Sequence, residues 1–109
     1  MIQNMQIKSE DIVFELKLKS RLTLIYGDSG AGKSFLYKLM LDKARAETDS
    51  RFIFFNHMVP DKKYIKSEIL TQKDKIFVID DADVILDNEL RSLISVNTSN
   101  QYIIFTHSI

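Results

Sequence analysis

Apolar and polar residues alternate along the first part of the chain, which is the pattern of a strand with one buried face. From Ile12 to Leu18 every second residue is apolar, and Met5 and Ile7 give a weaker version of the same pattern. The polar segment Ser9-Glu10-Asp11 between them is typical of a turn. Residues 1–21 therefore predict a pair of antiparallel strands.

After this segment, short apolar runs alternate with helical patterns. We predict four buried strands, at 22–26, 51–55, 76–79 and 102–105, and three helices between them, at 35–47, 62–70 and 88–96. This alternation is typical of an α/β fold in which helices cover both faces of a mainly parallel sheet. We expect a single domain over 1–109, with 1–21 as an N-terminal strand pair and 22–109 as the core.

The composition is that of an ordinary globular domain. Hydrophobic residues make up 45% of the 109 residues and charged residues 28%, so the chain can bury a core. The formal net charge is zero, which disfavours a free-standing nucleic-acid binder, and the lysines at 62, 63 and 66 are interpreted as a solvated helix face. No cysteine is present, and no apolar run reaches the length of a membrane span or of a signal-peptide core. We therefore expect a cytoplasmic location without membrane insertion.

All three glycines of the chain lie within one octet, between the first buried strand and the first long helix. The octet, Gly27-Asp28-Ser29-Gly30-Ala31-Gly32-Lys33-Ser34, fits the phosphate-binding P-loop pattern G-x-x-x-x-G-K-[ST]. Its glycines let backbone amides turn inward around a phosphate, and the following helix adds unpaired N–H groups and its positive end. Lys33 would contact the β- and γ-phosphates, Ser34 would ligate Mg²⁺, and the amide of Phe35 would reach a phosphate. The octet predicts a nucleoside triphosphate site, with a glycine-rich turn as the structural alternative.

Two carboxylates follow the apolar run 76–79 directly. Asp80 would lie at the carboxyl end of its strand, beside the octet, where it would hold Mg²⁺ through water. Asp81 stands where many P-loop ATPases carry a glutamate that polarises the attacking water. Aspartate is shorter by one methylene, so we expect slow or partner-assisted hydrolysis. A solvated Asp-Asp turn is the alternative for this pair, and Asp83 and Asp87 are interpreted as surface or helix-capping residues.

Polar residues also follow two other strands. We expect the last strand to lie between the strand before the octet and the strand before Asp80, so that its tip points at the γ-phosphate. Thr106 or His107 would then sense phosphate or orient water, with plain turn residues as the alternative. Asn56 or His57, which follow the run 51–55, is a further candidate to approach that water.

With these motifs the chain resembles the P-loop NTPases of the additional-strand group, which contains ABC-type and AAA+-type ATPases. The strands before GDSGAGKS and the segment IIFTHS are similar to the ABC side, where a Thr-His pair carries the switch histidine; this implies that role for His107. The segment FVIDDAD is similar to AAA+ proteins of the replication-initiator branch. The resemblance covers residues 1–108, but no glycine remains for an ABC signature, and the helical lid and a fifth core strand are missing. Either the domain is minimal or truncated, or the N-terminal strands complete the sheet.

These observations and the resemblance favour a domain that binds ATP and Mg²⁺, with an ATPase activity that is weak or depends on self-association or a protein partner. The choice of ATP over GTP rests on the resemblance. One alternative is a P-loop interaction module that regulates or inhibits a larger complex. A small-molecule kinase is less favoured: GDSG resembles uridine-kinase-type enzymes, but the chain has four arginines and no segment for an arginine-rich lid. Arg91 is our candidate for an arginine presented to a neighbouring subunit.

Overall fold

The computed structural model describes residues 4–8, 13–17, 20–26, 32–58 and 61–106. The elements in chain order are β1 (Asn4–Lys8), β2 (Val13–Lys17), β3 (Leu22–Tyr26), α1 (Lys33–Ala46), β4 (Phe52–Phe55), α2 (Lys62–Thr71), β5 (Ile76–Ile79), α3 (Ala82–Ile85), α4 (Asn88–Val96) and β6 (Gln101–Thr106). All the predicted strands and helices are present. The helix α1 begins two residues earlier than predicted, so Lys33 and Ser34 belong to its first turn. None of the helices in the described ranges is long and apolar enough to cross a membrane.

The main sheet has four strands in the order β3-β6-β5-β4, and every neighbouring pair is parallel. The last strand, β6, therefore lies between β3 and β5, as predicted. Because all four strands run the same way, their last residues meet at one edge of the sheet, which we call the carboxyl edge: Tyr26, Thr106, Ile79 and Phe55.

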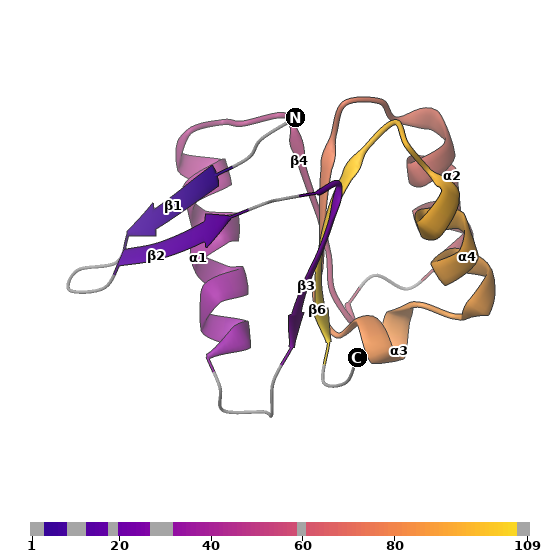
Figure 1. Cartoon of the computed structure of the whole chain (residues 1–109), viewed down its shortest axis with the longest axis horizontal. Helices are drawn as coiled ribbons and strands as arrows, with labels where there is room; N and C mark the ends of the chain where they lie inside the picture. Colours follow the sequence, from indigo (N-terminus) through magenta and orange to yellow (C-terminus); the bar gives the residue numbers. More distant parts are fainter. Residues whose placement is uncertain (1–3, 9–12, 18–19, 27–31, 59–60, 107–109) are drawn as a thin grey trace.

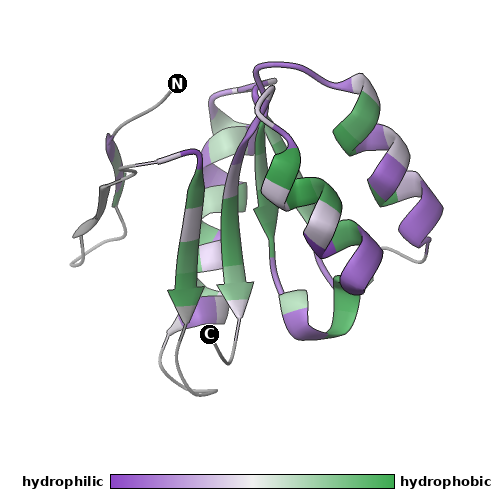
Figure 2. Cartoon of the chain, turned by 45° about the vertical axis from the view of Figure 1, so that its right-hand side comes forward, coloured by the Kyte–Doolittle hydropathy of each residue, from purple (hydrophilic) through white to green (hydrophobic). Residues whose placement is uncertain are grey.

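Helices cover both faces of this sheet, so the fold is an α/β arrangement of layers (Figure 1). The helix α1 and the β1–β2 pair lie on one side, and α2 and α4 lie on the other. Successive residues of the central strands point to opposite faces. Phe77 and Tyr102 join the cluster beneath α2 and α4, whereas Val78 and Ile103 join the cluster on the α1 side. Figure 2 shows the result as strands that are mostly hydrophobic and helices that carry both hydrophobic and hydrophilic residues.

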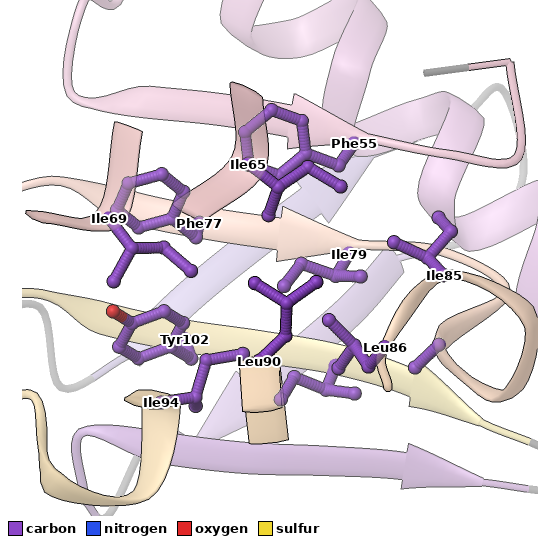
Figure 3. Close-up of a cluster of buried hydrophobic side chains, with 12 residues drawn as sticks. Phe55, Ile65, Ile69, Phe77, Ile79, Ile85, Leu86, Leu90, Ile94 and Tyr102 are labelled. Carbon is purple, nitrogen blue, oxygen red and sulfur yellow. The ribbon is translucent and has the colours of Figure 1, made fainter. Parts of the chain in front are cut away.

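The cluster beneath α2 and α4 is built on three aromatic rings from neighbouring strands (Figure 3). Phe55 stacks on Phe77 with ring centroids 5.8 Å apart, and Phe77 stacks on Tyr102 at 5.4 Å. Ile65 and Ile69 of α2 and Leu90 and Ile94 of α4 close this cluster from the helix side. The aromatic stack therefore ties the three strands β4, β5 and β6 together beneath one helical layer.

Both helices of this layer begin at an aspartate that caps them. The side chain of Asp61 accepts a hydrogen bond from the amide of Lys63 at 2.8 Å, and that of Asp87 accepts one from the amide of Leu90 at 2.9 Å. The capping role predicted for Asp87 is confirmed.

The N-terminal strands form a sheet of their own. Strands β1 and β2 pair antiparallel, from Asn4 opposite Lys17 to Lys8 opposite Val13, which confirms the predicted strand pair. The alternative that they complete the main sheet is wrong for the described residues. Met5 and Ile7 of β1 are instead buried in the cluster that contains α1, because their side of the strand is apolar.

Candidate functional site

Polar residues from three strands gather at the carboxyl edge, which is where α/β sheets most often bind ligands. Thr106 ends β6, Asp80 and Asp81 follow β5, and Asn56 and His57 follow β4. The octet joins the same edge, because it leads from the end of β3 to the start of α1. Its first five residues, 27–31, lie outside the described residues, so their phosphate contacts stay predictions.

The described end of the octet opens the helix α1. Gly32 has φ 88° and ψ 8°, a left-handed conformation that glycine adopts without the strain of a side chain. Neither a side-chain cap nor an acidic residue is present in the first turn, so its amides and the positive end of the helix dipole face no carboxylate of that turn. Lys33 donates from Nζ to the backbone oxygen of Thr106 at 3.2 Å. Ser34 and Phe35 are exposed.

Asp80 is half-buried, and its pKa is raised. Burial is the main cause and the charge of Asp81 the second, whereas an Asp81 backbone hydrogen bond and the charges of His57 and Lys33 act in the opposite direction. A carboxylate in this setting is stabilised by any added positive charge.

The oxygen donors at this edge suit Mg²⁺. The ion prefers hard oxygen ligands and keeps several waters, and Ser34 and Asp80 offer a hydroxyl and a carboxylate. Among the described residues no group of three or more histidines, aspartates or glutamates is placed to hold a metal ion. A Mg²⁺ ion here would therefore take its remaining ligands from water and phosphate.

Asp81 and His57 form a pair across two strands. Nδ1 of His57 lies 2.9 Å from Oδ2 of Asp81. The backbone of Asp81 has φ 52° and ψ 45°, a left-handed conformation that is uncommon outside glycine but tolerated by aspartate. The carboxylate of Asp81, which the sequence predicts to polarise water, is therefore hydrogen-bonded to the imidazole of His57.

Thr106 is held in a similar way by a carboxylate. Its side chain is buried, and Oγ1 donates to Oδ1 of Asp83 at 2.7 Å. Asp83 is exposed, as predicted, but its bond to Thr106 is not foreseen by the pattern, because it depends on the four-residue helix α3. His107 lies outside the described residues, so its role stays a prediction.

Tyr37 is a site residue that the apolar pattern of the first helix does not single out. It is buried, and its ring lies edge-on to Phe54 and Phe105, with centroid distances of 5.7 and 6.0 Å. Burial and the charge of Asp80 raise the pKa of Tyr37 to about 12, although its hydrogen bond with Asn56 opposes this change. Tyr37 therefore links α1 to the end of β4 directly beside the candidate site.

Several charged side chains of α2 and α4 form ion pairs or hydrogen bonds within the described structure. Lys66 pairs with Glu89 at 2.5 Å, and Lys62 lies 3.8 Å from Asp87. Arg91 is exposed and donates from Nε to the backbone oxygen of Leu86 at 3.1 Å. The interpretation of the lysines as a solvated helix face agrees with their exposure.

No protein-family model matches the chain, and no curated protein matches it.

Proposed function

We propose that this chain is a P-loop domain that binds ATP and Mg²⁺ at the carboxyl edge. The observation that carries the proposal is the position of the octet in the sheet. It joins β3 to α1, and the strand order β3-β6-β5 brings Lys33, Thr106 and Asp80 to one edge. A phosphate site needs a cationic side chain, inward-facing amides and a metal-binding carboxylate together, and this order supports that combination.

Each group has a distinct role in the proposal. Lys33 neutralises the β- and γ-phosphates, the amides of residues 27–35 bind phosphate oxygens, and Ser34 and Asp80 hold Mg²⁺ directly or through water. A bound Mg²⁺ ion neutralises phosphate charge and orients the γ-phosphate. Hydrolysis is slow in this proposal, and appreciable turnover depends on self-association or a protein partner in the cytoplasm.

A second candidate function is a P-loop interaction module with poor catalysis. The open side of β3 favours it, since β3 is the terminal strand of the described sheet and Leu24 on it is 42% exposed. An unpaired strand edge with an exposed apolar side chain is a site for pairing with another chain.

Nucleotide titration tests the proposal. Isothermal calorimetry with ATP, ADP and GTP, with and without Mg²⁺, would be run on the wild type, on Lys33→Ala and on Lys38→Ala, which removes an exposed lysine of the same helix. A charge-assisted phosphate contact contributes about 1.5–3 kcal/mol, so Lys33→Ala should weaken Mg-ATP binding at least about tenfold, whereas Lys38→Ala should not.

Phosphate release measured on the same samples separates the two candidate functions. Binding with turnover supports the ATPase, and binding without turnover at any protein concentration supports the interaction module. Equal Mg-ATP affinity of the wild type and Lys33→Ala would overturn both forms of the proposal.

A further inference from the structure

The pair of His57 and Asp81 joins the ends of two neighbouring strands. The residues are 24 positions apart in the sequence, and the parallel pairing of β4 with β5 brings them together. The side chain of His57 is 60% exposed and that of Asp81 33% exposed, so a substrate can reach the imidazole.

The hydrogen bond between them fixes the tautomer of the neutral imidazole. An ionised carboxylate can only accept, so the hydrogen must be on Nδ1. Nε2 then carries the lone pair and is the basic atom of the ring. Among the described residues, the imidazole of His57 is hydrogen-bonded to Asp81 alone. Its Nε2 atom is therefore left to act on a ligand.

The strand end that precedes His57 also contacts the candidate metal ligand, because the amide of Asp80 donates to the backbone oxygen of Phe55 at 2.8 Å. The charges of His57 and of Lys33 both act on the carboxylate of Asp80. His57 and Asp80 therefore follow neighbouring strands, and Lys33, which donates to the backbone oxygen of Thr106 at the end of β6, belongs to the same carboxyl edge.

We infer that His57 is the general base of the hydrolysis, and that Asp81 is a positioning residue that orients its ring. This inference rests on the proposed ATPase function. Nε2 of His57 takes a proton from water while the water oxygen forms a bond to the γ-phosphorus. The bond from that phosphorus to the β,γ-bridging oxygen breaks, and ADP leaves with its electron pair. The proton on His57 then passes to solvent, which restores the free base.

Two chemical reasons favour His57 over Asp81 as the base. An imidazole binds a proton more strongly than a carboxylate and is the side chain most often used in this role. Asp81 is also shorter than the glutamate usual at such positions, and the bond to His57 extends its reach by one ring. The pair then works as a carboxylate and a histidine do in other hydrolases, where the carboxylate holds the tautomer and does not take the proton.

The test compares His57→Ala, Asp81→Asn and Met58→Ala, the last being a control that removes an exposed neighbour of His57. Mg-ATP binding would be measured by calorimetry, and phosphate release in single turnover with protein in excess, both with and without added imidazole. We expect the three variants to bind Mg-ATP as the wild type does. His57→Ala should lower the rate about 10²–10⁴-fold and recover part of it with imidazole. Asp81→Asn should lower the rate without recovery, and Met58→Ala should match the wild type.

A signature independent of rate is the Nδ1–H proton of His57 in the NMR spectrum, which Asp81→Asn should shift upfield. A His57→Ala rate equal to or above that of the wild type would overturn the inference and return the role of base to Asp81. A rate loss in His57→Ala that added imidazole does not partly reverse would also overturn the inference. Failure of the wild type to bind Mg-ATP would instead refute the proposed function, and the inference with it.

Discussion

The hydrogen bond between Thr106 and Asp83 should contribute measurably to stability, because it fastens α3 to the end of the central strand β6. Thr106→Val keeps the shape of the side chain and removes only the hydroxyl that donates to Asp83 at 2.7 Å. A hydrogen bond to a charged group contributes about 1.5–3 kcal/mol. Asp83 is exposed and regains water when the bond is lost, so we take the lower value of about 1.5 kcal/mol. With an unfolding entropy of about 0.23 kcal/mol/K for a chain of this length, the melting temperature should fall by about 6 °C.

A double-mutant cycle isolates this bond from other effects of the substitution. Urea unfolding would be measured for the wild type, Thr106→Val, Asp83→Ala and the double variant, with Thr106→Ser as a control that keeps the hydroxyl. The coupling free energy should be about 1–1.5 kcal/mol. Additivity of the two single changes to within about 0.3 kcal/mol would refute the reasoning.

Three further predictions concern single residues. Burial and a neighbouring carboxylate raise the pKa of Asp80, so its contribution to stability is present in acid and is lost as the pH rises through that pKa. Asp80→Asn should therefore have a higher melting temperature than the wild type at pH 7 in EDTA, and this difference in melting temperature should shrink below about pH 4. The same variant should impair Mg²⁺-dependent nucleotide binding more than Asp83→Asn does. Asn100 is 1% exposed, and its side chain makes three hydrogen bonds. Asn100→Ala should therefore lower the free energy of unfolding, measured with urea, by about 3 kcal/mol. The surface control Asn88→Ala should lower it by less than about 1 kcal/mol. A Cβ added at Gly32 would have no atom within 4 Å, but residue 32 has φ 88°, which strains any residue with a side chain. Gly32→Ala should therefore lower the free energy of unfolding by about 1–2 kcal/mol, measured by thermal unfolding. An unchanged melting temperature would contradict the left-handed geometry.

The elements that sequence patterns predict are those whose signals lie within the element itself. The strand Ile76–Ile79 is a continuous apolar run, and the helix Lys62–Thr71 begins just after a capping aspartate. The place of β6 between β3 and β5 is predicted by the strand topology that the octet and Asp80 imply together.

The parts that patterns miss depend on contacts between distant residues. The helix α3 has four residues, which is too short for a helical period to be visible. The bonds of His57 to Asp81 and of Thr106 to Asp83 join side chains on different elements, and no local signal marks either pair. Tyr37 is missed for the same reason, because its contacts beside the site are with residues of other elements: Phe54 of β4, Phe105 of β6, and Asn56 just after β4.

The central position of β6 has a consequence for how the chain reaches its fold. This strand leaves the ribosome after β3, β4 and β5, yet it separates β3 from β5 and hydrogen-bonds to both. The pairing of β3 with β6 joins segments about 80 residues apart, so the loop between them must close late and at a large entropic cost. Until then β3 has no partner in the main sheet, and the nascent chain carries its glycine octet on an unpaired strand. In the proposed function, nucleotide binding at this octet would begin only once synthesis has passed Thr106, so the last strand would couple folding to binding.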